Sequence, residues 1–214
     1  EQWFGDFARM NPSSRCVLEK DNQNRFVKCA IVFGPALEIL KVAGLDVVAV
    51  DACHTKHIIA KGMQLHVVTG RNGAGRNVQI AISLQESETV ESYTWLSEQL
   101  KSSGFGAIIK RSAQDSNKLL VMHDGFKGTD KFLKNEDNVH HAFCVKHLEG
   151  SCRSALRKMK KTNPAVNVGF HLNQMLAVTS ATTEQDLNAA LVNLNRSNPH
   201  VAEYIKEKDP KMWS

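Results

Sequence analysis

Short apolar runs separated by turn residues fill the middle of the chain, and this pattern predicts β-strands. Residues 47–50 form a compact run rich in β-branched side chains, which is typical of a buried strand. Residues 105–109 predict another short strand. Four further apolar runs predict strands on the same grounds, at residues 62–69, 77–84, 118–123 and 139–143.

Apolar residues recur at helical spacing elsewhere in the chain. Residues 89–103 contain Trp95 and end before Gly104, which predicts a helix closed by a glycine cap. Near the N-terminus, residues 15–18 and 25–33 flank a polar turn cluster and predict a β-hairpin. Other helices are expected at residues 36–42, 129–133, 147–160, 182–195 and 199–206.

The order of these elements predicts a mixed five-stranded α/β sheet flanked by helices. Three strands in succession form an antiparallel meander, and the next strand returns beside the first through a right-handed crossover. We expect three segments along the chain. They are an N-terminal helix and hairpin at residues 1–44, the sheet-containing core at 45–162 and an all-helical segment at 163–214.

The composition is that of a globular protein, with 42% hydrophobic and 23% charged residues. No apolar run reaches the ~20 residues of a membrane helix, so no membrane partner is expected. The formal net charge of +5 is a mild basic bias that is compatible with nucleic acid. Five scattered cysteines favour a reducing intracellular compartment over a disulfide framework, and the start at Glu1 suggests a fragment.

Two carboxylates follow core strands of the expected sheet. Asp51 ends the first strand and Asp124 ends the fourth, so the crossover would bring their side chains together. Paired carboxylates supply the hard oxygen ligands that Mg²⁺ prefers. Two such ions can activate water and stabilise the leaving oxygen of a phosphodiester. The alternative is that each aspartate only caps its strand and begins a turn.

Several short motifs surround these acids. Residues 51–56 read Asp-Ala-Cys-His-Thr-Lys, residues 124–128 read Asp-Gly-Phe-Lys-Gly, and residues 141–148 read His-Ala-Phe-Cys-Val-Lys-His-Leu. A helix with Trp95 lies between the two acids, and an Asn198-Pro199 segment follows later. In this order and spacing the motifs resemble the transposase domain of Mutator-like elements, over almost the whole chain.

The resemblance implies a ribonuclease-H-like fold and a cut-and-paste transposase that cleaves DNA and transfers strands. Asp51 and Asp124 would be its first two catalytic acids and would hold Mg²⁺ or Mn²⁺. The third acid, a Glu, would lie beyond Ser214. The sequence context does not match at four glutamates of this chain, Glu149, Glu184, Glu203 and Glu207. The resemblance also implies a nuclear location, transposon ends as partner and a homo-oligomer, with His54, Cys144 and His147 lining the site.

The Cys144-x-x-His147 pair has another interpretation. Structural zinc needs four ligands, and no clean second pair accompanies this one, although Cys53, His54, Cys152 and other candidates exist. The pair could also be a buried cysteine and a surface histidine at the start of a helix.

The densest positive charge follows that pair. It could follow a DNA backbone through phosphate contacts, or it could be an ordinary solvated helix face. The residues expected to contact DNA are Lys127, Arg153, Arg157, Lys158, Lys160 and Lys161.

A second function remains open from the sequence. Ala52 and Cys53 stand where the resembled family carries Gly-Thr, and no residue here matches its third acid. These departures favour a catalytically inactive, transposase-derived module that binds DNA or protein as a regulator or effector.

Overall fold

The computed structural model describes residues 2–56, 62–114, 117–125, 128–133 and 136–207. Within them the chain divides into two compact units, residues 1–141 and 142–214. This division differs from the three expected segments. The N-terminal hairpin groups with the sheet, and the basic helix groups with the helices that follow it.

The first unit is a mixed α/β unit. Its helices are α1 (Gln2–Met10), α2 (Gly34–Ala43), α3 (Val90–Ser102) and α4 (Gly106–Gln114), with a 3₁₀ turn at Thr129–Lys131. Its strands are β1 (Arg15–Lys20), β2 (Phe26–Val32), β3 (Gly44–His54), β4 (Gln64–Asn72), β5 (Asn77–Gln85) and β6 (Leu119–His123). The last strand, β7 (Val139–Phe143), crosses the boundary between the units.

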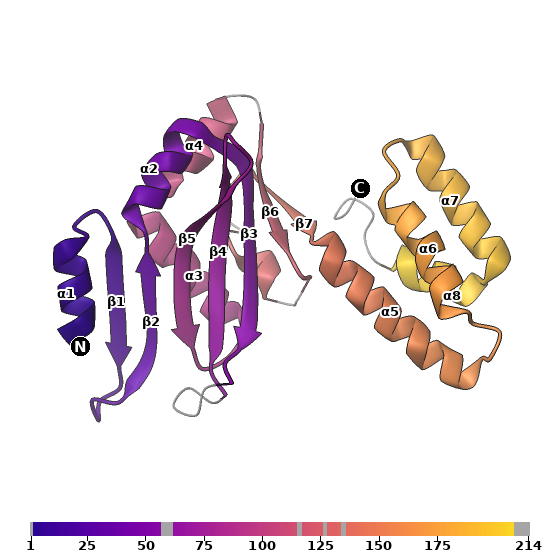
Figure 1. Ribbon diagram of the computed structural model, residues 1–214, viewed down its shortest axis with the longest axis horizontal. Coiled ribbons are helices and arrows are strands. Elements are labelled where there is room, and N and C mark those ends of the chain that lie inside the picture. Colours follow the sequence, from indigo (N-terminus) through magenta and orange to yellow (C-terminus); the bar gives the residue numbers. More distant parts are fainter. Residues whose placement is uncertain (1, 57–61, 115–116, 126–127, 134–135, 208–214) are drawn as a thin grey trace. The chain divides into compact units, whose positions relative to one another are not determined.

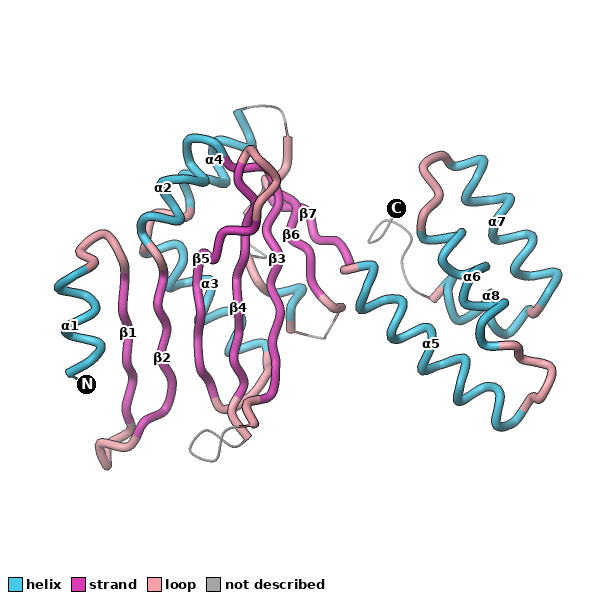
Figure 2. Tube along the Cα trace, viewed as in Figure 1, coloured by secondary structure: helices cyan, strands magenta, loops and turns pink. Residues whose placement is uncertain are grey.

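The described strands form one seven-stranded sheet in the order β1-β2-β5-β4-β3-β6-β7 (Figure 1). The expected meander is confirmed, because β3 pairs antiparallel with β4 and β4 pairs antiparallel with β5. The expected return of the fourth core strand beside the first is confirmed as well, since β6 lies beside β3 and parallel to it. Figure 2 traces the strands and the connections between them.

The N-terminal hairpin is part of the sheet, which therefore has seven strands where five were expected. Strand β2 pairs antiparallel with β5 from Cys29↔Leu84 to Val32↔Ala81. Its last residues are almost completely buried, so pairing with β5 also removes apolar surface from water. The helix α1 lies alongside β1 at the outer edge of the sheet.

The prediction of a strand at residues 105–109 is wrong, because most of this segment belongs to helix α4. Its buried side chains are Ile108, Ile109 and Ser112, which share one helical face. A short apolar run is compatible with either a strand or a buried helix. The helix expected after Gly128 is only the 3₁₀ turn.

Helices α2, α3 and α4 pack against the sheet and build the core of this unit. Along β3, buried Val48 and Val50 alternate with the more accessible Val47, Ala49 and Asp51. Because side chains alternate between faces, one face of β3 carries the core and the other carries the aspartate.

The second unit is helical in its described part. It contains α5 (Val145–Thr162), α6 (Val168–Thr179), α7 (Glu184–Ser197) and α8 (Pro199–Lys206). Side chains of all four helices meet in one apolar cluster, which includes Leu156, Met175, Leu194 and Val201. Asn167, Thr183 and Asn198 cap the starts of α6, α7 and α8. None of the described helices is long and apolar enough to cross a membrane.

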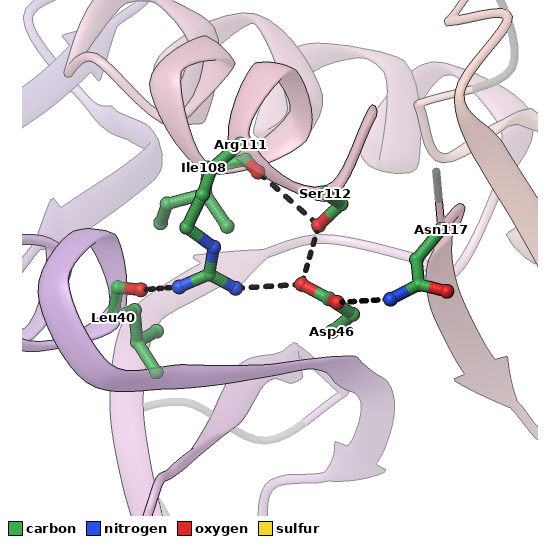
Figure 3. Close-up of polar contacts among 6 residues, drawn as sticks. All are labelled: Leu40, Asp46, Ile108, Arg111, Ser112 and Asn117. Atoms are coloured by element: carbon green, nitrogen blue, oxygen red, sulfur yellow. Dashed lines mark hydrogen bonds and ion pairs between the residues drawn. The ribbon is translucent and has the colours of Figure 1, made fainter. Parts of the chain in front are cut away.

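A polar cluster fixes the beginning of β3 (Figure 3). Asp46 Oδ1 accepts hydrogen bonds from Arg111 Nη2 at 2.6 Å and from Ser112 Oγ at 2.7 Å. Asp46 Oδ2 accepts from Asn117 Nδ2 at 3.4 Å, and Arg111 Nη1 also donates to the carbonyl of Leu40. The cluster therefore connects β3, α2, α4 and the approach to β6.

We predict that Asp46→Asn lowers the free energy of unfolding by about 1–3 kcal/mol, because hydrogen bonds to a charged acceptor are lost. Burial is the largest influence on the pKa of Asp46 and raises it, but the bonds from Ser112 and Arg111 and the charge of Arg111 together lower it below its ordinary value. The stability difference between wild type and Asp46→Asn is therefore largest above the pKa that Asp46 has in the unfolded chain. It disappears as pH falls through the pKa of Asp46 in the folded chain.

Urea unfolding of both proteins across this pH range measures the difference. Asp6→Asn is the matched control, because Asp6 pairs only with the exposed Arg9 on helix α1. Its effect should be under about 0.5 kcal/mol. An equal loss of stability in both variants would contradict the role of the cluster.

Candidate functional site

The register of two parallel strands brings Asp51 and Asp124 to neighbouring positions. Strand β3 pairs with β6 through Val47↔Leu120, Val48↔Val121 and Ala49↔Met122. Two residues further, the same register sets Asp51 opposite Asp124, which directly follows β6. Paired strands lie ~4.8 Å apart. The two carboxylates therefore start from adjacent backbones at the same end of the sheet.

Asp51 faces an open groove on the sheet. The side chain is exposed, and its Oδ1 accepts a hydrogen bond from the Ala52 backbone N–H at 2.9 Å. The groove has a volume of about 420 Å³ and a mostly apolar floor, lined by Val47, Ala49, Leu65, Val67 and Met122 among others. Asp51 is thus an acid accessible to solvent on rigid strand backbone.

The loop that carries Asp124 is closed by His123. The Gly125 N–H donates to His123 Nδ1 at 3.1 Å, and the Thr129 hydroxyl lies 2.8 Å from the same nitrogen. Gly125 has a φ of 83°, a conformation that favours glycine. Together these contacts fix both ends of the turn after Asp124.

The same loop packs against the start of α3. A Cβ on Gly128 would lie 3.0 Å from the carbonyl carbon of Thr89 and 3.1 Å from Tyr93 Cδ2. Its φ of −132° is open to other residues, so the close approach is what requires glycine. The Asp124 loop and the N-terminus of α3 are therefore held together.

That contact brings a third carboxylate, Glu88, into the neighbourhood of the two aspartates. Glu88 precedes the N-cap Thr89, and its Oε1 accepts a hydrogen bond from the buried Tyr93 hydroxyl at 2.5 Å. Burial is the largest influence on the pKa of Glu88 and raises it; the charges of Asp124 and Asp51 raise it further, against the Tyr93 hydrogen bond. Sequence reasoning missed Glu88.

Tyr93 is the residue that fixes Glu88. Its ring is fully buried and lies edge-on to His66, with 5.1 Å between ring centroids. Burial and the bond to Glu88 raise the pKa of the Tyr93 hydroxyl, so it remains a hydrogen-bond donor at neutral pH. Burial also lowers the pKa of His66 to about 4, which keeps that imidazole neutral.

His54 lies at the end of β3, three residues after Asp51. It is exposed, and Gln64 Nε2 on the neighbouring strand lies 2.6 Å from its Nδ1. Its positive form would lower the pKa of Glu88, which indicates that the two side chains are within electrostatic range. That His54 lines the site stays a prediction.

Cys144 and His147 belong to the second unit, at the start of α5. Cys144 is the N-cap residue and is partly buried, whereas His147 is exposed in the first turn. In the part of the chain that the structure describes, no three His, Cys, Asp or Glu side chains form a ready metal site.

The expected DNA-contacting residues fall into two groups. Lys127 lies outside the described residues. The other five are all exposed on helix α5, namely Arg153, Arg157, Lys158, Lys160 and Lys161.

We predict that Gly128→Ala destabilises the first unit by about 1–3 kcal/mol, the usual range for overpacking. The added methyl group would push the Asp124 loop away from Thr89 and Tyr93. Thermal or urea unfolding measures the change. Gly106→Ala is the matched control, because no atom lies within 4 Å of the position that a Cβ would take there. If Gly128→Ala were as stable as Gly106→Ala, the close contact would not hold.

We also predict a pH-dependent gain of stability in Glu88→Gln. A raised pKa means that folded Glu88 binds its proton more tightly than unfolded Glu88. Wild-type stability therefore falls as pH rises from the unfolded value of ~4.3 through the folded pKa, whereas the glutamine variant lacks this loss. Unfolding midpoints across this window test it. The exposed Glu86→Gln variant should follow wild type, and a Glu88→Gln curve parallel to wild type would refute the coupling.

No protein-family model matches this chain, and no curated protein matches it at a significant level. The likeness to Mutator-like transposases therefore depends on the short motifs and their spacing. What the structure adds is a geometric relation between two of those motifs, the neighbouring strand ends that carry Asp51 and Asp124.

Proposed function

We propose that this chain is part of a DNA transposase of the Mutator-like type, in which Asp51 and Asp124 bind divalent metal for phosphodiester cleavage and strand transfer. The observation that carries the proposal is the parallel β3–β6 register, which sets the two aspartates on adjacent strand ends.

The fold supports the proposal at a coarser level. An antiparallel meander followed by a parallel fourth strand is the topology expected for a ribonuclease-H-like core. Strand β7 continues the same sheet beyond β6. The hairpin β1–β2 is then an addition at the far edge of that core.

The two aspartates are donors of the kind that a hard divalent cation takes. Carboxylate oxygens on rigid strand ends are the ligands that Mg²⁺ and Mn²⁺ take in proteins, and Asp51 is accessible to solvent. When bound, such ions supply an activated water or hydroxyl and stabilisation of the leaving oxygen. Sheet hydrogen bonds hold the Asp51 backbone, and the His123 and Gly128 contacts hold the Asp124 loop.

Glu88 gives the site a third negative group. Tyr93 orients its carboxylate from the buried side, so the group cannot swing freely toward solvent. The charges of Asp124 and Asp51 repel the ionised form of Glu88, and a divalent cation would relieve that repulsion. This is the arrangement expected where stability is given up for ligand binding.

Two observations favour a second function. The described residues offer no group of three metal-ligating side chains in place, and Ala52-Cys53 replaces the Gly-Thr of the resembled family. Both features suit a transposase-derived module that binds DNA or protein without cutting.

The first test measures Mn²⁺ binding to the chain by electron paramagnetic resonance. We expect Asp51→Asn and Asp124→Asn each to weaken binding by more than about tenfold, since each removes a direct ligand. The exposed Glu86→Gln should remain within about twofold, because it removes one negative charge outside the site. Equal binding by wild type and both aspartate variants would remove the basis of the proposal.

A cleavage assay separates the two candidate functions. Mn²⁺-dependent nicking of plasmid DNA that is lost in Asp51→Asn would favour the enzyme. DNA binding with no nicking, by a protein that does bind Mn²⁺, would favour the inactive module. Melting temperatures of the variants must match wild type for either outcome to count.

A further inference from the structure

Helix α5 concentrates the positive charge of the protein. It carries six Lys and Arg residues against a single acid, Glu149. Its formal charge of +5 therefore equals that of the whole chain, whose other charges cancel. A charge so localised creates a strong local potential, which a uniformly mixed surface would not.

Four of these cations form one narrow row along the helix, which we call the basic stripe. At 100° per residue, they fall within about 60° of the helix circumference. The row extends over about 21 Å at a rise of 1.5 Å per residue. Its members are Lys146, Arg153, Arg157 and Lys160. Lys161 lies beside it, but Lys158 projects about 100° or more from every member of the stripe.

Carboxylates neutralise only part of the stripe. Glu149 pairs with Arg153 at 2.9 Å and with Lys146 at 3.6 Å. Within the described residues, Arg157 and Lys160 form no ion pair. Gly150 lies beside the stripe with no atom near its Cβ position, so a ligand backbone can approach the helix there.

The apolar side of α5 is already occupied. Leu148, Cys152 and Leu156 recur every four residues and are buried in the core of the second unit. A membrane-surface helix needs its apolar face free to enter the lipid, so this helix cannot bind in that way. Its accessible surface carries six cations and one acid, Glu149, and this excess of positive charge suits a partner with regularly spaced negative charges.

We propose that the basic stripe is a docking surface for the phosphate backbone of double-stranded DNA. Phosphates of one strand recur every 3.4 Å along the duplex axis, and the strand winds around that axis, so the four cations of a straight row about 21 Å long can reach only some of the phosphates in that length. The contacts read charge and not base sequence. This inference deepens the proposed function, since it depends on DNA being the substrate and assigns the surface that holds it.

The test compares two adjacent cations on the same helix. Binding of the full chain to a labelled 24-base-pair duplex is measured by fluorescence anisotropy in EDTA, over a range of salt concentrations. We expect Arg157→Gln to weaken binding about eightfold at 0.1 M salt and to reduce the log–log salt slope by about 0.9, the counterion release of one phosphate contact. Lys158→Gln should stay within about twofold of wild type.

Arg157→Gln and Lys158→Gln are matched controls for each other. Each removes one positive charge from an exposed position of α5, and the replaced residues have similar helix propensity. The double variant Arg153→Gln/Lys160→Gln should reduce the log–log salt slope by about twice as much, because it removes two phosphate contacts. Equal effects of Arg157→Gln and Lys158→Gln would overturn the proposal that the basic stripe docks DNA, because net charge alone would then explain binding. Absence of wild-type binding, or equally stripe-dependent binding to anionic phospholipid vesicles, would overturn it too.

The experiment is independent of the metal site. Because EDTA removes divalent ions, the DNA-binding measurement does not depend on metal at Asp51 and Asp124. Loss of stripe-dependent binding would leave the Mn²⁺ result untouched. Loss of Mn²⁺ binding with intact stripe-dependent DNA binding would overturn the cleavage proposal and retain the docking surface.

Discussion

The site depends on the parallel pairing of β3 with β6. Only three residue pairs define that register, from Val47↔Leu120 to Ala49↔Met122. Parallel strands need a long crossover, here α3 and α4, whose buried faces form the core under the sheet. The apolar core therefore determines where the two aspartates end, because the same helices that fill it also return the chain to β3.

Two carboxylates on β3 show how position decides the role of an acid. Asp46 is surrounded by donors from Arg111, Ser112 and Asn117, which satisfy its charge and connect three elements. Asp51, five residues later, faces an open groove, with other acids in its neighbourhood. The first acid stabilises the fold, and the second is the one that we propose binds a cation.

Much of this organisation could be predicted from the sequence. Strand periodicity and the preference for simple connections were enough to pair β3, β4, β5 and β6 and to place Asp51 beside Asp124. The segment around Ile108 was misassigned because a five-residue apolar run fits either a strand or a helix. Glu88 was missed because it lies in a polar segment typical of a surface loop, and only the later Tyr93, which needs a buried partner, hints at its role. The stripe on α5 follows from helical spacing, but which side is free is decided by the packing of Leu148, Cys152 and Leu156.

Helix α1 has a consequence for how copies of this protein behave together. Strand β1 is the outermost strand, and an uncovered edge presents backbone donors and acceptors that can pair with another chain. With α1 alongside it, and with Phe7 packed edge-on against Phe33 at 6.3 Å, that template is obstructed by the protein's own N-terminal residues. Unwinding of α1 would expose the edge and separate Phe7 from Phe33, so polymerisation by strand addition would begin there.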